Sequence, residues 1–440
     1  MADWSPLSDA TTGTSSSPGQ TRGGGNLASI LGNVLSLTLG AGTAQALMAA
    51  AVLLTARQLG TAKFGEYSAS FSAVGLAAIL FNLGLDTWLL RNGAHGSEQL
   101  RTSLGKALAI KMVAGIPWMA GIIVILPRLN PGTFHWQLVL LSAVTIWVEG
   151  FFTIGLSVFK ALLRNQVTAL LLVGARGGTL LLTVLLIAAH SQEAAPYAWV
   201  RLAAGVIGLL VTALLLPVKP RASSMVSLRQ AARESLPFAL SDLLTSVYMQ
   251  ADVTITAILL TKESVGLYAP ASSLINALFV IPSAGYSVMV PVLVRQVEAK
   301  SPSLNRVLGL TIASFAVGGI ILWVGAWYVS SVLPRFILGN SFEKSGPLLA
   351  ILSPIIFLKS CSFAAAALLV AVGWQNRRTV VQAASAIANV ALNLAIIHRF
   401  GVTGVAVVYV VSELLLTVGY MGLVIRWVRR VDAGKRESLP

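Results

Sequence analysis

The chain has 440 residues, of which 56% are hydrophobic and 11% are charged. Soluble domains carry about 25% charged residues, so this composition excludes an ordinary globular protein. The formal net charge of +15 fits a membrane protein whose Lys and Arg gather in cytoplasmic loops better than it fits a nucleic-acid binder. A single cysteine, Cys361, excludes an intramolecular disulfide, and four scattered histidines show no metal-ligand spacing. We expect neither a metal nor a cofactor.

The first 28 residues are rich in Ser, Thr and Gly and lack the apolar content needed to fold, which predicts a disordered cytoplasmic tail. They do not have the pattern of a signal peptide, because Asp3 and Asp9 stand where a basic start is expected. The first apolar run is therefore expected to act as an uncleaved anchor.

Apolar runs long enough to cross a bilayer, about 20 residues each, recur along the rest of the sequence. They predict an all-α polytopic membrane protein with about twelve transmembrane helices. The predicted spans are 31–55, 66–90, 107–126, 136–158, 167–189, 196–217, 236–260, 266–292, 307–333, 347–371, 379–397 and 403–426.

The basic residues follow this division of the chain. If the N-terminal tail is cytoplasmic, the inner segments carry 20 Lys and Arg and the outer segments carry 7. Because Lys and Arg are enriched in cytoplasmic loops, this bias predicts that both termini face the cytoplasm. We expect the protein to lie in the plasma (cytoplasmic) membrane.

Weak internal repeats divide the chain into two halves. Gly65, Tyr67 and Gly84 are repeated 201 positions later, and the connections after the predicted spans four and ten are similar at an offset of 211. Two six-helix lobes in the same orientation predict a pseudo-two-fold axis along the membrane normal, with the site between them. The lobes are expected at 29–218 and 236–428, joined by a cytoplasmic amphipathic linker at 219–235 and followed by a basic cytoplasmic tail at 429–440.

Short motifs resemble a known family over almost all of residues 30–430. They are Ala56-Arg57-x-Leu59-Gly60-x-x-x-Phe64-Gly65-x-Tyr67, Asn82-x-Gly84, Pro237, Asp252, Val265-Gly266-x-Tyr268-x-x-Ala271 and Pro291. This pattern is similar to that of oligosaccharide flippases, the polysaccharide-biosynthesis, O-antigen (Wzx) type of the multidrug/oligosaccharidyl-lipid/polysaccharide exporter superfamily. The resemblance implies two six-helix lobes around a central cleft, and a sugar chain on a polyprenyl pyrophosphate as the substrate. A long acidic tract and an extra pair of spans, which a lipid II flippase would carry, are absent.

Ionisable residues within predicted spans each need an explanation, because burying one at the centre of a span costs roughly 2.5–3.5 kcal/mol. A pyrophosphate needs fixed cations, so we expect Arg176 and Lys359, with Arg57 at the outer mouth, to bind the substrate. A carboxylate in a poorly hydrated helix can take up a proton near neutral pH. The family pattern puts Asp252 first as an ion-coupling residue, followed by Asp242 and Glu413.

Two pairs of opposite charges stand at near-equivalent places in the two halves. Glu149 and Lys359 are 210 positions apart, and Arg201 and Glu413 are 212 apart. One hypothesis is that at least one pair approaches across the cleft in one state and separates in the other, forming a gate. The alternative is that each charge pairs within its own lobe, as Glu149 would with Arg176.

These features predict a non-enzymatic flippase that moves polyprenyl-pyrophosphate-linked oligosaccharide from the inner to the outer leaflet by alternating access, coupled to H⁺ or Na⁺. The expected partners are this lipid, the coupling ion, membrane lipid and polysaccharide-assembly enzymes, with no nucleic acid. The alternative is a multidrug or organic-cation antiporter of the same superfamily, which a cleft dominated by carboxylates would favour. A membrane-bound polymerase or acyltransferase would need a catalytic cluster in a long outer loop, and the sequence has no such loop.

Overall fold

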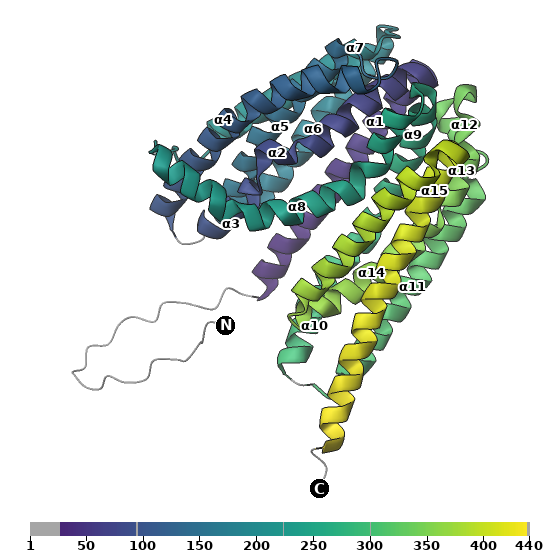
Figure 1. The fold of residues 1–440 in the computed structure, drawn as a ribbon. Helices are drawn as coiled ribbons and strands as arrows, with labels where there is room; N and C mark the ends of the chain where they lie inside the picture. Colours follow the sequence, from purple (N-terminus) through teal and green to yellow (C-terminus); the bar gives the residue numbers. More distant parts are fainter. Residues whose placement is uncertain (1–26, 94–95, 223, 300, 438–440) are drawn as a thin grey trace.

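A computed structural model of the chain describes residues 27–93, 96–222, 224–299 and 301–437. Within these ranges the chain forms α-helices and one short 3-10 helix, without a strand, so the predicted all-α fold is confirmed (Figure 1). The predicted tail at 1–28 lies outside the described residues except for its last two positions. Of the predicted basic tail at 429–440, residues 438–440 also lie outside them.

The helices follow one another with short connections. The first half contains α1 (Leu27–Ala77), α2 (Ile79–Asn82), α3 (Leu85–Gly93), α4 (Ser97–Leu129), α5 (Trp136–Ala161), α6 (Asn165–Ala188) and α7 (Ala194–Leu215). The second half contains α8 (Met225–Leu259), α9 (Lys262–Leu278), α10 (Val280–Glu298), α11 (Leu304–Val329), α12 (Leu333–Leu338), η1 (Asn340–Phe342), α13 (Ser345–Leu352), α14 (Pro354–Ala371) and α15 (Gln375–Glu437).

Nine helical stretches in the described part of the chain are long and apolar enough to cross a membrane, so the protein is a multi-pass membrane protein. Two of the longest helices each contain a sharp kink, at Gly60 in α1 and at Gly401 in α15, where φ is 71° and 55°. Glycine adopts positive φ readily, so each position allows the chain to change direction between two helices. The count of twelve spans stays a prediction.

The helix boundaries repeat at the offsets seen in the sequence, or within one position of them. Helices α1 and α9 end at Ala77 and Leu278, which are 201 positions apart. Helices α6 and α15 begin at Asn165 and Gln375, which are 210 positions apart. The backbone therefore breaks at equivalent residues in the two halves, which supports the internal repeat.

The two ends of the molecule differ in how the halves meet. Figure 1 shows the start of α1 and the end of α15 at one end of the molecule and α12 at the other. The end at α12 is here called the Gly60 end, because Arg57, three residues before the kink at Gly60, donates a hydrogen bond to the Ile337 carbonyl of α12. At the Gly60 end α1 packs along α9, and Lys262 of α9 forms an ion pair with Glu66 of α1. The largest hydrophobic cluster, which includes Phe64, Tyr268 and Phe342, draws on both halves.

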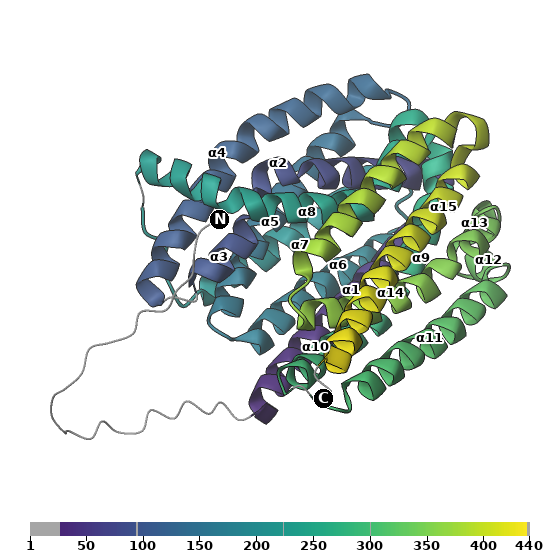
Figure 2. The same cartoon turned by 60° about the horizontal axis from the view of Figure 1, so that its bottom comes forward.

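Helix α8 connects the two halves. It contacts α3 and α4 in the first half and α9 and α15 in the second, and Figures 1 and 2 show it running from the side of α3 toward α9. Residues 225–235, which were expected to form a separate linker on the membrane surface, are the first turns of this helix. Ala231 among them is buried against the first half, in a cluster with Leu100 and Leu104 of α4. An apolar face on these turns therefore packs against protein.

Candidate functional site

A cavity of about 690 Å³ lies between α1 of the first half and α8, α10, α14 and α15 of the second. This volume is within the range of about 300–1,000 Å³ that is usual for small-molecule sites. The polar side chains that line it include Asn276, Ser283, Tyr286, Ser287, Lys359, Ser362, Gln375, Arg378, Thr379, Gln382 and Tyr420. Two of the described lining residues are cations and none is a carboxylate, so the cavity wall is cationic.

Lys359 reaches the cavity from the middle of α14. Its ammonium group donates a hydrogen bond to Glu413 Oε2 at 3.1 Å and lies 5.3 Å from the centre of the Phe279 ring. Glu413 of α15 is fully buried, and Ser362 Oγ also faces it at 3.5 Å. Because ion pairing compensates the loss of hydration of both groups, this carboxylate can remain buried behind the wall.

Arg378 is the second cation of the wall, one turn from the start of α15. Its Nη1 donates to the Tyr286 hydroxyl at 3.5 Å, and its Nε is buried without a hydrogen-bond partner among the described residues. A buried guanidinium N–H that lacks an acceptor is costly, and an anion in the cavity could supply that acceptor. The neighbouring Arg377 is exposed and stacks on Trp374 at 4.0 Å, away from the lining.

The first half contains its own charge cluster. Glu149 of α5 accepts hydrogen bonds from Arg176 of α6 at 2.9 Å and from two nitrogens of Arg201 of α7 at 3.3 and 3.2 Å. The guanidinium of Arg201 also lies 4.2 Å from the centre of the Phe71 ring. The space among these side chains is only about 10 Å³, so Arg176 and Arg201 are engaged with Glu149 rather than lining a large cavity.

The two clusters correspond to each other through the repeat, with the charges exchanged. In the first half the acid is on α5 and its partner Arg201 is on α7, whereas in the second half the base is on α14 and its partner Glu413 is on α15. In this structure each charge therefore pairs within its own half. Glu149 and Lys359, the pair considered for a gate across the cleft, each have other partners here.

Asp252 of α8 is buried in a different setting. The Tyr268 hydroxyl donates to its Oδ2 at 3.3 Å, and Asn393 Nδ2 donates to its Oδ1 at 2.7 Å. Among the described residues no Lys or Arg forms an ion pair with it, in contrast to Glu149 and Glu413. The nearby Asn393 Oδ1 is buried and accepts no hydrogen bond from the described residues. A carboxylate and a free amide oxygen are suitable ligands for a small cation, and the carboxylate can also bind a proton.

A further buried cation, Lys111 of α4, was not predicted from the sequence as an intramembrane charge. Its side chain is fully buried and donates to Asp86 Oδ1 at 3.0 Å and to the Gly150 carbonyl at 2.7 Å. Asp242 of α8, expected to couple an ion, lies within electrostatic range of Lys111 and Asp86. Asp242 is not among the described residues that line the cavity, and its role in ion coupling stays a prediction.

Arg57, expected at the outer mouth of the substrate site, is exposed near the kink at Gly60. Its Nη1 donates to the Ile337 carbonyl of α12 at 3.4 Å. It does not belong to the described lining of the cavity, and it links the two halves at the Gly60 end. Lys359 is the predicted substrate-binding residue that lines the cavity.

The fold is that of known multi-pass transporters. A multidrug resistance MATE family transporter of the MOP superfamily, in an inward-facing conformation, matches with a TM-score of 0.71 and 16% identity over 90% of this chain and 96% of its own. The lipid II flippase MurJ, in an inward closed conformation, matches with a TM-score of 0.74 and 13% identity over 88% and 87% of the two chains. The eukaryotic MATE transporter AtDTX14 matches with a TM-score of 0.59 and 15% identity over 90% and 95%. No curated protein sequence matches the chain.

The chain therefore has the fold that a multi-pass multidrug transporter and a lipid II flippase share. The model of the family described as "Polysaccharide biosynthesis protein" matches residues 30–297 of the 440-residue chain. This match covers more than half of the sequence, and the protein belongs to this family. The family resemblance seen in the sequence motifs is confirmed.

Proposed function

We propose that the protein is a flippase that moves a polyprenyl-pyrophosphate-linked oligosaccharide from the cytoplasmic to the outer leaflet by ion-coupled alternating access. The observation that carries this proposal is the charge of the cavity wall. Lys359 and Arg378 line it, and no described lining residue is a carboxylate. Such a wall attracts an anionic head group and disfavours the organic cations that a multidrug exporter would carry.

Arg378 is the residue best suited to hold the pyrophosphate. A guanidinium matches phosphate oxygens with two parallel hydrogen bonds, and the buried Nε of Arg378 has no other acceptor in the described part of the chain. The charge of Lys359 is partly compensated by Glu413, so we expect Lys359 to contribute mainly a hydrogen bond from its ammonium group to the substrate. The amide and hydroxyl groups of Gln375, Gln382 and Tyr420 are suitable donors and acceptors for sugar hydroxyls.

Asp252 is the proposed coupling site. An ionised carboxylate that is buried without a cationic partner is unfavourable, so it is stabilised by a bound proton or a small cation. Because α8 contacts both halves, the occupancy of Asp252 can be transmitted to their relative position. The coupling ion is written here as a second substrate, either H⁺ or Na⁺.

The test is transfer of a labelled polyprenyl-pyrophosphate oligosaccharide across proteoliposomes, with and without an ion gradient. We expect gradient-driven transfer by the wild type and a 10- to 100-fold loss for Arg378→Gln, since a hydrogen bond to a charged group contributes about 1.5–3 kcal/mol. The matched control is Arg377→Gln, which removes the adjacent exposed guanidinium and should leave transfer close to the wild-type rate.

Two results would overturn the proposal. The first is an absence of lipid-linked sugar transfer together with export of an organic cation, which would assign the alternative function. The second is an equal loss for Arg377→Gln and Arg378→Gln, which would show that general surface charge rather than the cavity wall binds the head group.

A further inference from the structure

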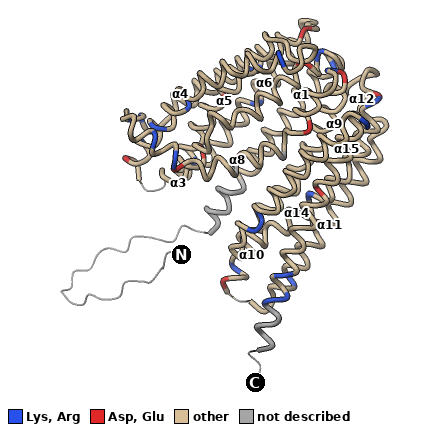
Figure 3. Tube along the Cα trace, viewed as in Figure 1, with Lys and Arg blue, Asp and Glu red and all other residues tan. Residues whose placement is uncertain are grey.

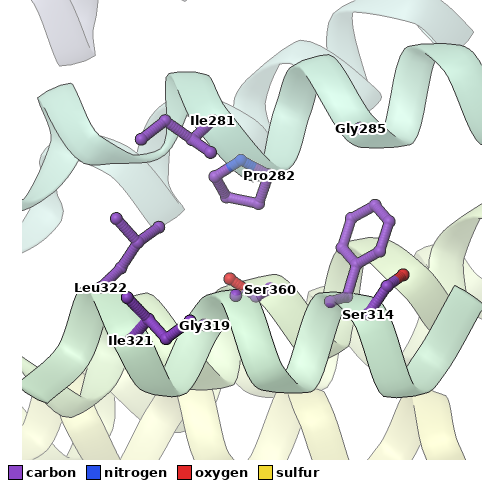
Figure 4. A pocket seen from close by; sticks show the side chains of 10 residues that line it. Ile281, Pro282, Gly285, Ser314, Gly319, Ile321, Leu322 and Ser360 are labelled. Atoms are coloured by element: carbon purple, nitrogen blue, oxygen red, sulfur yellow. The ribbon is translucent and has the colours of Figure 1, made fainter.

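An apolar groove of about 390 Å³ lies between α10 and α11, outside the cationic cavity. Figure 4 shows Ile281 and Pro282 of α10 facing Ile321 and Leu322 of α11, with Ser360 of α14 between them. Ile281 is 56% exposed and Ile321 is 65% exposed, so the groove opens to the surroundings of the helices. In a multi-pass membrane protein an apolar surface of this kind faces lipid.

Two glycines of α11 shape the groove. A Cβ on Gly319 would come within 2.9 Å of Ser360 Cβ, so this glycine allows α11 and α14 to pack closely beneath the groove. A Cβ on Gly318 would meet no atom within 4 Å, so the absence of a side chain there leaves open space. The space at Gly318 is therefore part of the groove and is not used for packing between helices.

A second apolar hollow adjoins both the groove and the cavity. It has a volume of about 350 Å³, shares Gly285 and Phe315 with the groove, and extends to Thr38 and Leu39 of α1. Thr38 also lines the cationic cavity. The three hollows therefore form a series of neighbours, from the cationic wall past Thr38 to the groove on α11.

Helix α10 separates the polar part of this series from the apolar part. Its Ser283, Tyr286 and Ser287 line the cationic cavity, whereas its Ile281 and Pro282 line the groove. A molecule that fills both parts must have an anionic, hydrogen-bonding head and an apolar chain attached to it.

We propose that the groove between α10 and α11 binds the first isoprene units of the polyprenyl chain while the pyrophosphate occupies the cationic cavity. This inference rests on the proposed function and adds a site for the apolar part of the substrate. The chain then leaves the cavity past Thr38, between α1 and α10, and lies on α11 instead of mixing freely with bulk lipid. Binding of the chain orients the head group before the halves move.

The experiment uses a polyprenyl-pyrophosphate sugar with a photoreactive diazirine in its first isoprene units, added to the full-length protein in nanodiscs without an ion gradient. We expect labelling of α11 residues 314–322. The variant Gly318→Leu fills the open space and should reduce this labelling about tenfold, the effect of losing the burial of roughly two methylene groups. The matched control is Gly325→Leu on the same helix, where the added side chain also meets open space but lies outside the groove.

Labelling that is as strong around Gly325 as around Gly318, or that Gly318→Leu does not change, would overturn the inference. So would equal labelling of 314–322 by a phosphatidylglycerol with the same diazirine, because the groove would then hold bulk phospholipid. Wild-type transfer in proteoliposomes is measured in parallel. Transfer without groove labelling refutes the groove alone, whereas no transfer by the wild type refutes the proposed function itself.

Discussion

Gly65 of α1 and Gly266 of α9 lie in reciprocal contact at the Gly60 end. A Cβ on Gly65 would come within 1.8 Å of the Lys262 carbonyl oxygen, and a Cβ on Gly266 within 1.9 Å of the Thr61 carbonyl oxygen. Thr61 and Lys262 are 201 positions apart, and so are Gly65 and Gly266. The contact of Gly65 with Lys262 is therefore repeated, with the two halves exchanged, in the contact of Gly266 with Thr61. Reciprocity of this kind is expected of a contact across a two-fold axis.

Substituting either glycine should therefore weaken the contact between the halves at this end. Gly65→Ala forces a methyl group into the partner backbone, which cannot move aside as a side chain would, and we expect a cost of about 1–3 kcal/mol to the closed contact. Spin labels at Glu193→Cys and Glu263→Cys, with the buried Cys361 replaced by Ser, should report a longer distance in the variant. Gly174→Ala, where the added methyl meets open space, is the control. An unchanged distance in Gly65→Ala would contradict the prediction.

Hydropathy and charge predict the membrane class and the all-α fold, because the bilayer imposes helix length and the positive-inside bias marks the loops. Matching residues at fixed offsets predict the repeat. They do not predict which charges meet. Offsets of 210 and 212 positions identify Glu149 with Lys359 and Arg201 with Glu413 as equivalent positions, but equivalent positions of two halves need not be in contact. In this structure Glu149 pairs with Arg176 and Arg201, and Lys359 pairs with Glu413, so these charges are neutralised within their own halves.

Two other residues show why the site could be predicted only in part. From the sequence, Arg378 is interpreted as a residue of an inner loop, because it follows the apolar run of α14. In the structure it lies in the first turn of α15, and the direction of this helix places its side chain in the cavity wall. Lys111 is the fifth residue of the predicted third span, a position at which a lysine side chain can extend to the membrane surface. The structure instead buries this side chain completely. Sequence gives depth in the membrane, whereas the facing direction of a side chain comes from packing between helices.

The ion pair between Lys359 and Glu413 should behave as one unit. Lys359→Met leaves a fully buried carboxylate without its cation, and we expect a loss of about 3–5 kcal/mol in stability. The double variant Lys359→Met/Glu413→Gln removes both charges and should regain most of this loss. Thermal unfolding in detergent measures the coupling between the two sites. Additive losses in the double variant would show that the two residues act independently.

The cluster in the first half gives a test of the gate hypothesis. Because Arg201 holds Glu149 with two hydrogen bonds, Glu149→Arg should reduce transport, and the exchange Glu149→Arg/Arg201→Glu should restore it in part. The corresponding exchange between the halves, Glu149→Lys/Lys359→Glu, should give no rescue if the charges pair only within their halves. Rescue by that second exchange, measured as proteoliposome transfer, would instead indicate that Glu149 and Lys359 approach each other in another state.

Asp252→Asn should uncouple transport from the ion gradient. Asparagine keeps the size of the side chain and can still accept from Asn393 Nδ2, but it carries no charge to attract a proton or a cation. We expect transfer that no longer responds to an imposed H⁺ or Na⁺ gradient, with thermal stability close to that of the wild type. Comparing the two gradients in the wild type identifies the ion. If transfer by the Asp252→Asn variant still depended on the ion gradient, Asp252 would not be the coupling residue.

The contact between α8 and the first half depends on Gly84, a position where a larger side chain would not fit. Gly84 has a φ of 68°, and a Cβ there would come within 2.3 Å of the Ala239 backbone nitrogen of α8. Gly84→Ala therefore combines backbone strain with a steric clash, and the first turns of α8 should separate from α3 and α4. Hydrogen exchange measures this separation. We expect faster exchange over residues 225–240, while residues 251–259, where Asp252 is hydrogen-bonded to Asn393 of α15, keep their protection. Because α8 contacts both halves, a detached first segment should also lower the transfer rate. An unchanged exchange pattern in Gly84→Ala would show that this contact does not depend on close packing at Gly84.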